Sequence, residues 1–183
     1  MSFKPLTMSA QVTYVSSADP AVDWDAIVAA ELELHPDVRD SDKPWDAKRA
    51  VAEEKFLERY TVACLKDPAV SLSMLKIKQG EQPTKFVIGV IPPEEMSRIA
   101  DECRLGGESA MPSQAKWRAF LSSIRDVQNF GAAPVPKRKV GDVEYVEPAW
   151  LNKSFARGLR EIALGVGIIS WRWNQLREDE IKN

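Results

Sequence analysis

The chain has 183 residues, of which 44% are hydrophobic and 28% are charged, and its formal net charge is −2. These values are ordinary for one globular domain, and they give no global field that favours nucleic acid or a membrane surface. No segment approaches the roughly 20 apolar residues that span a bilayer, and the N-terminus has no signal-peptide core. Two widely separated cysteines without such a signal predict reduced thiols and a cytoplasmic protein.

The charge is distributed unevenly along the chain. Residues 19–67 contain 13 acidic and 7 basic residues, whereas residues 68–183 contain 14 acidic and 17 basic residues. An acidic front and a mildly basic back can bind each other within one chain, or head to tail between copies. The alternative interpretation is a scatter of solvated surface charges, which contribute little energy individually.

The N-terminal part predicts a short strand and two helices. Alternation over residues 12–15 is typical of an edge strand. Asp19 and Pro20 favour a helix start, and the residue before Pro36 ends that helix. A second helix is predicted from about Pro44 to Lys66. The apolar residues expected to face inward are Trp24, Ile27, Val28 and Leu32 in the first helix and Phe56, Leu57, Tyr60 and Cys64 in the second.

The middle of the chain predicts a hairpin, two helices and a second small hairpin. Residues 70–78 alternate and residues 85–91 are rich in β-branched residues, so these two stretches are expected to pair across a turn at 79–82. Pro92-Pro93 opens a helix that reaches about Arg104, with Met96, Ile99 and Cys103 inward. Residues 112–129 predict a further helix, whose apolar stripe is Trp117, Phe120, Leu121 and Ile124, and residues 140–146 predict a small hairpin.

The C-terminal residues 148–183 predict one long amphipathic helical arm. Its apolar residues recur at spacings of three and four: Leu151, Phe155, Leu159, Ile162, Val166, Ile169, Trp173 and Leu176. This repeat is typical of helices packed along a seam. Lys153, Arg157 and Arg160 form a basic edge beside the stripe. Gly165 and Gly167 predict a kink, a split into two helices with Ser170 as an N-cap, or the close approach of a neighbouring backbone.

The apolar stripe of the arm permits two interpretations. Burial in the chain's own core is the usual fate of such a face. An interface with another protein is the alternative, because the arm is terminal and carries tryptophan and arginine residues, which are enriched at binding hot spots. The candidate interface therefore comprises the eight apolar residues of the stripe and the three residues of the basic edge.

The sequence contains no recognisable catalytic or cofactor site. Cys64, Cys103 and His35 lack the close spacing that zinc ligands need, and there is no nucleophile elbow. Gly165-Val166-Gly167 lacks the third glycine of a dinucleotide fingerprint, and no strand precedes it. The basic run Lys137-Arg138-Lys139 offers only a small electrostatic footprint, so nucleic acid is disfavoured. We therefore expect a non-enzymatic protein without a cofactor, metal or small-molecule substrate, unless His35 and a cysteine converge.

The order of features from residue 85 onward resembles a family of small tailed-bacteriophage morphogenesis proteins. The matching pieces are Lys85-Phe86-Val87-Ile88, Pro93-Glu94-Glu95, Asp101 to Arg104, Val127-Gln128-Asn129-Phe130, Pro134-Val135-Pro136 and the Glu178-to-Asn183 tail. Such proteins are similar to tail-assembly chaperones and minor virion components. Residues 19–78 have no counterpart in this plan, and the loop at 131–136 lacks its acidic-glycine turn.

The expected fold is mainly α within the α+β class, with about five helices, one or two small antiparallel hairpins and a long C-terminal helix. We expect an acidic helical segment at 1–78, a hairpin and two helices at 79–147, and the arm at 148–183, forming one globular unit with an arm. The resemblance implies a phage structural or assembly protein in the host cytoplasm or the virion, bound to other phage structural proteins or to itself. The alternative is a small regulatory or inhibitory protein that binds a host factor through residues 19–67.

Overall fold

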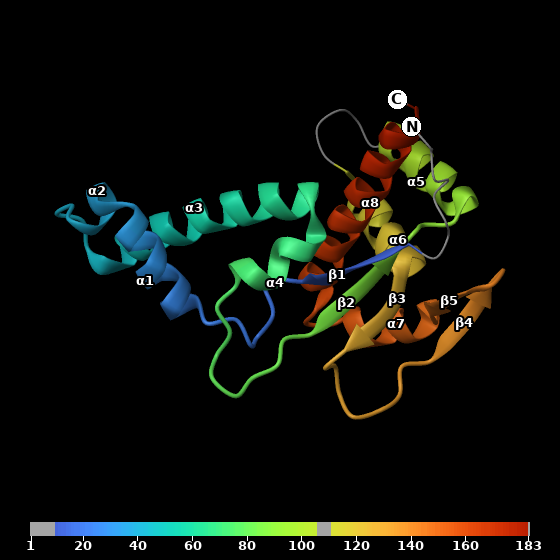
Figure 1. The fold of residues 1–183 in the computed structure, drawn as a ribbon, viewed down its shortest axis with the longest axis horizontal. Coiled ribbons are helices and arrows are strands. Elements are labelled where there is room, and N and C mark those ends of the chain that lie inside the picture. Colours follow the sequence, from blue (N-terminus) through green and yellow to red (C-terminus); the bar gives the residue numbers. More distant parts are fainter. Residues whose placement is uncertain (1–9, 106–110, 183) are drawn as a thin grey trace.

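The computed structural model describes residues 10–105 and 111–182, and it describes the side chains of residues 10–104 and 111–175. Within these residues eight α-helices and five strands form a mixed α+β fold (Figure 1), so the predicted class is confirmed and about five helices was too few. The helices are α1 (Trp24–Leu34), α2 (Pro36–Arg39), α3 (Trp45–Lys66), α4 (Ser71–Met74), α5 (Pro93–Leu105), α6 (Ser113–Ser123), α7 (Pro148–Phe155) and α8 (Arg160–Lys182), with a 3-10 turn η1 (Pro68–Val70). The strands are β1 (Gln11–Val15), β2 (Lys85–Gly89), β3 (Ile124–Gln128), β4 (Lys137–Val140) and β5 (Val143–Val146).

The main sheet has the order β1-β2-β3 and is antiparallel throughout. Phe86 and Ile88 of β2 enter the largest apolar cluster, together with residues of α6 and α8. Val87, on the opposite face, lines a polar cleft beside β4 and β5. Helices therefore cover one face of the sheet, and the β4–β5 hairpin stands against the other. That hairpin confirms the second predicted hairpin.

The first predicted hairpin, between residues 70–78 and 85–91, is wrong. Residues 68–74 form η1 and α4 instead, and Ile77 makes only an isolated bridge to Val22. Asp67 Oδ1 accepts a hydrogen bond from the amide of Ala69 at 3.0 Å, which favours a helical turn after Asp67. Because β1 takes the position beside β2, the alternation in residues 70–74 has no strand to pair with.

The helix predicted over residues 112–129 ends at Ser123, and Ile124 begins strand β3. Ser122 Oγ donates to the carbonyl of Arg118 at 2.7 Å, a contact that competes with continuation of a helix. Ile124 and Val127 are buried, and β3 pairs with β2 through a register shift between Val87 and Ile88. Pairing with a strand distant in sequence therefore overrides the helical spacing of the apolar residues.

The first helix begins at Trp24, with Asp23 as its N-cap, and not at Pro20 as predicted. Asp19 instead accepts bonds from the amides of Ala21 at 2.9 Å and Thr84 at 3.0 Å. These bonds hold the turns that precede α1 against the loop before β2. The predicted end at His35 and the helix over α3 are confirmed, but α2 follows His35 directly.

The C-terminal arm is two helices, α7 and α8, and the break lies at 156–159. Gly158 adopts a φ of +70°, a conformation that a residue with a Cβ rarely takes. The predicted split into two helices at Gly165 and Gly167 is wrong, because α8 runs through both residues, and Ser170 is an interior residue of α8 and not an N-cap. Gly167 instead allows a close approach by the backbone of Lys116 in α6.

The largest core cluster draws residues from all three sequence segments. Tyr60 of α3, Phe86 of β2 and Phe155 of α7 belong to it, and Phe86, Phe120 and Phe155 form an aromatic group with ring centroids 5.3–6.1 Å apart. Figure 1 shows that α1, α2 and the first part of α3 extend away from this core. A small separate cluster of Val28, Leu32 and Ala52 holds that extension together.

Candidate protein-binding surface

The apolar stripe of the C-terminal arm lies in the chain's own core. Its members with described side chains are at most 7% exposed, apart from Leu159, which is half-buried; they are Leu151, Phe155, Ile162, Val166, Ile169 and Trp173. The side chain of Leu176 lies outside the described residues. Of the two interpretations of the stripe, the structure therefore shows intramolecular burial, and these residues present no surface to a partner.

The basic edge of the arm, in contrast, is exposed. Lys153 lies on α7, Arg157 in the turn after it, and Arg160 at the first position of α8. None of the three forms an ion pair within the part of the chain that the structure describes. The guanidinium of Arg160 lies 5.6 Å from the ring centroid of Trp117. We call these three residues the basic corner.

Among the side chains that the structure describes, the large exposed apolar ones lie in a different part of the chain, within residues 34–72. They are Leu34, Trp45, Leu57, Val62 and Leu72. Leu57 was expected to face inward with Phe56, but it is 39% exposed, and Val62 is 50% exposed. Isolated exposed apolar residues are normal, whereas two near each other on the solvent-exposed side of one helix favour a contact surface.

A shallow, open depression follows the exposed side of α3, and every residue that lines it belongs to that helix. It is lined by Ala50, Glu53, Glu54, Leu57, Glu58, Thr61 and Val62. No lysine or arginine lines it. We call it the acidic groove. A second open depression, which shares Glu58 and Val62, adjoins it and is lined also by Lys55, Arg59, Ala63 and Lys66.

The charge of the acidic groove is only partly neutralised within the chain. Glu53 accepts a hydrogen bond from Arg49 Nε at 2.8 Å, one turn earlier on α3. Glu54 and Glu58 are exposed, and neither forms an ion pair with any residue described in the structure. The groove thus combines an apolar floor with two available carboxylates, an arrangement suited to a basic amphipathic partner.

The opposite face of α3 holds the groove in place. Phe56, Tyr60 and Cys64 are buried, and the Tyr60 hydroxyl donates to the carbonyl of Val15 in β1. Burial raises the pKa of the Tyr60 hydroxyl well above its usual range, so it stays protonated as a donor. Arg59 bonds the buried carboxylate of Glu31 on α1 at 2.5 Å. These contacts join α3 to both α1 and the sheet.

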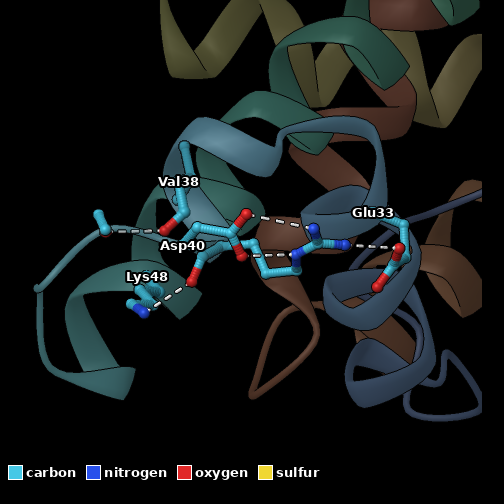
Figure 2. Close-up of polar contacts among 6 residues, drawn as sticks. Glu33, Val38, Asp40 and Lys48 are labelled. Carbon is cyan, nitrogen blue, oxygen red and sulfur yellow. Dashed lines mark hydrogen bonds and ion pairs between the residues drawn. The ribbon is translucent and has the colours of Figure 1, made fainter.

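Polar contacts also order the turn between α1 and α3 (Figure 2). The guanidinium of Arg39 bonds both Glu33, on α1, and Asp40, after α2, at 2.9 Å each. Lys48 Nζ of α3 donates to the carbonyl of Arg39 at 2.7 Å. These exposed bonds are individually weak, but together they connect the three helices near the start of the groove.

The structure does not bring His35 together with a cysteine. His35 Nε2 lies 3.5 Å from the carboxylate of Glu31, at the end of α1. Cys64 is buried in the largest core cluster, and Cys103 packs against the separate cluster of Ile91 and Ile99 on α5. Among the described residues, no three His, Cys, Asp or Glu side chains gather as they would around a metal ion.

The basic run at residues 137–139 lies beside a polar cleft of about 550 Å³ with mixed charge. Lys137 Nζ is 3.0 Å from Asp126, and Lys139 stands opposite Glu144 in the hairpin. Arg125 crosses the sheet at Gly89, donates to the carbonyl of Glu144 at 3.2 Å, and lies 3.9 Å from the Tyr145 ring centroid. Arg125 thereby attaches the hairpin to the sheet.

The sequence did not predict the acidic groove. An amphipathic helix with one buried face already explains the spacing of Ala52, Phe56, Tyr60 and Cys64. Leu57 and Val62 fall outside that repeat, and this second apolar set was the available signal.

Within the described residues, no helix is long and apolar enough to cross a bilayer. No protein-family model, curated protein or solved structure matches the chain.

Proposed function

We propose that this chain is a non-enzymatic binding protein of bacteriophage morphogenesis that contacts its partner through the acidic groove of α3. The observation that supports this proposal is the exposure of Leu57 and Val62 beside the unpaired Glu54 and Glu58, on a helix whose other side is buried in the core. Interfaces are assembled from such surfaces, in which apolar contact supplies affinity and charge supplies selectivity.

The assignment to phage morphogenesis rests on the resemblance of residues 85–183. Tail-assembly chaperones and minor virion components act through contacts with other structural proteins, which agrees with an exposed binding face and a buried C-terminal stripe. The protein would act in the host cytoplasm during assembly or stay in the finished particle. Its function requires no cofactor and no small-molecule substrate.

A second function is favoured by the position of the groove in the chain. The acidic groove lies within residues 19–78, the segment that has no counterpart in the morphogenesis family. A phage-encoded protein that binds and inhibits a host factor would place its contact surface in such a segment. The partner, and not the surface, distinguishes this function from the first.

Affinity capture tests both functions. The purified chain and a Leu57→Ser/Val62→Ser variant serve as baits in phage-infected and uninfected host lysates, and bound proteins are identified by mass spectrometry. Leu72→Ser, at an exposed apolar residue outside the groove, is the matched control. Circular dichroism establishes that all three baits are folded.

Capture of virion or tail proteins from infected lysate, lost only with the groove variant, supports the assembly function. Capture of one host protein from both lysates, again lost with that variant, supports inhibition. Equal capture by the wild-type chain and the groove variant overturns the assignment of the surface. A chain that remains monomeric in light scattering and captures no protein contradicts both functions.

A further inference from the structure

We propose that the acidic groove of one copy binds the basic corner of a second copy, so that the chain assembles head to tail. This inference rests on the proposed function, because it assigns a partner to the same groove. The two surfaces are the groove on α3, with Glu54 and Glu58, and the corner formed by Lys153, Arg157 and Arg160.

The acidic side favours a cationic partner. Three glutamates line the groove and no basic side chain does, although Lys55, Arg59 and Lys66 line the adjoining depression that shares Glu58 and Val62. Arg49 pairs with Glu53, whereas Glu54 and Glu58 lie one helical turn apart on the exposed side of α3. A partner that places cations at a similar spacing would contact both carboxylates.

The basic corner supplies three cations that are close together in sequence. Lys153 lies on α7, Arg157 in the turn after it, and Arg160 at the first position of α8. All three are exposed and unpaired within the described chain, and Arg160 is partly ordered by Trp117. Ala149 and Ala156 are the small exposed residues beside them, so a helix can approach without a bulky obstruction. Glu161 is the one acidic residue next to the corner in sequence.

The alternative basic cluster at residues 137–139 is a poorer fit. Lys137 is already paired with Asp126, and Lys139 faces Glu144 across the hairpin. Asp142 also lines the adjoining cleft. Nearby carboxylates therefore already neutralise much of the positive charge of residues 137–139, whereas the charges of the basic corner are not paired within the described residues.

The two surfaces lie on separate parts of the molecule. Figure 1 shows α3 extending away from the sheet, at the left, and α7 beneath the sheet, toward the lower right. A contact between different patches on identical chains is heterologous, so each bound copy leaves one groove and one corner free. Repetition of this contact produces a closed ring or an open filament, which are the arrangements that virion assembly uses.

Sedimentation velocity of complementary charge variants tests the proposal. The wild-type chain is expected to form dimers and larger species that dissociate as salt increases, because the contact is between exposed charges. Glu54→Lys/Glu58→Lys and Arg157→Glu/Arg160→Glu should each weaken self-association by about tenfold or more, since two attractive pairs become repulsive. An equimolar mixture of the two variants should associate again, because each reversed surface then meets its complement.

The full chain with Lys137→Glu/Lys139→Glu is the matched control, and it should associate as the wild type does. Wild-type monomer at low salt, or a mixture that does not restore association, overturns the head-to-tail contact. Dimers that withstand all three reversals also overturn it and indicate a different interface. A monomeric chain that still captures virion proteins through Leu57 and Val62 contradicts this inference alone and leaves the proposed function in place.

Discussion

The carbonyl oxygen of Lys116 in α6 lies only 2.0 Å from the position that a Cβ atom on Gly167 in α8 would take. This glycine sits inside a helix, where alanine would ordinarily be more stable. The close packing of α6 against α8 therefore depends on the missing side chain. Since Ile162, Ala163 and Val166 on the same helix are buried, the crossing is part of the main core.

Replacing Gly167 with alanine should destabilise the protein by about 1–3 kcal/mol, because a backbone atom cannot move aside as a side chain does. Gly165→Ala is the matched control, since a Cβ there meets nothing within 4 Å. It should stabilise the protein by about 0.5–1 kcal/mol through helix propensity. Urea denaturation measures both. Equal effects of the two substitutions would show that the helices do not approach so closely.

Asn174 should be needed for stability because it satisfies a buried backbone amide just after strand β2. Its Oδ1 accepts from the amide of Ile91 at 2.9 Å, and its Nδ2 donates to the carbonyl of Ser170 at 2.8 Å. Asn174→Ala leaves the Ile91 amide buried without this partner and should cost about 1–3 kcal/mol. Asn152→Ala, at an exposed position of α7, should have little effect in the same thermal unfolding measurement. Hydrogen exchange at Ile91 should accelerate only in the Asn174 variant.

The Glu31–Arg59 pair should contribute more to stability than the exposed ion pairs of the chain. Glu31 is 3% exposed, and its carboxylate contacts both Arg59 and His35. Arg59→Met removes the cation but keeps an apolar stem, and should destabilise the fold by about 1–2 kcal/mol because the carboxylate remains buried. Arg98→Met breaks the more exposed pair with Glu95 and should cost less than about 0.5 kcal/mol. Restoration of stability in an Arg59→Met/Glu31→Leu double variant would support this cause, whereas additive losses would contradict it.

The two cysteines should differ sharply in reactivity. Burial raises the pKa of the Cys64 thiol from 9.0 to about 11, partly offset by a hydrogen bond with Tyr60. Burial also raises the pKa of Cys103, which is only half-buried. At pH 8 a thiol reagent should therefore modify one cysteine of the native chain, Cys103, and modify Cys64 only after urea is added. Peptide mapping identifies the modified residue, and rapid native labelling of Cys64 would contradict its burial.

The same burial should make the fold sensitive to alkaline pH. The thiol of Cys64 is protonated in both states below its ordinary pKa, so its contribution to stability is complete there. Between about pH 9 and the folded pKa of about 11, the unfolded chain releases the proton and the folded chain keeps it, so the free energy of unfolding falls. A Cys64→Ala variant should show a shallower fall over this interval. An unchanged slope would assign the loss to Tyr60 or Tyr14, whose pKa values burial also raises.

Elements with local signals could be predicted from the sequence, whereas elements that depend on a distant strand partner could not. The repeat through Phe56, Tyr60 and Cys64 indicated α3, and Pro93 with its following carboxylates indicated α5, because both signals are local. Ile124 matched a helical stripe but lies in a strand, since β2 provides hydrogen-bond partners that no local pattern reveals. The alternation through Leu72 failed for the complementary reason, because β1 pairs with β2 in its place.

The candidate site depended even more on tertiary structure. The sequence indicated both an acidic N-terminal segment and a basic edge at Lys153, Arg157 and Arg160, and all three residues of that edge are exposed. The sequence could not decide whether apolar residues of α3 or those of the C-terminal stripe stay exposed. A buried apolar helix face and an exposed one have the same periodicity. Packing of α8 against α6 buries the C-terminal stripe, whereas only one side of α3 meets the core.

The sequence by itself thus determined the mixed class, the long helices and the separation of charge, since propensity, capping and composition act over a few residues. Tertiary structure alone decided the strand partners, the position of the break at Gly158 and the exposure of Leu57 and Val62. Those features depend on which surfaces meet across long sequence separations, and that choice is set by the free energy of the whole packed core.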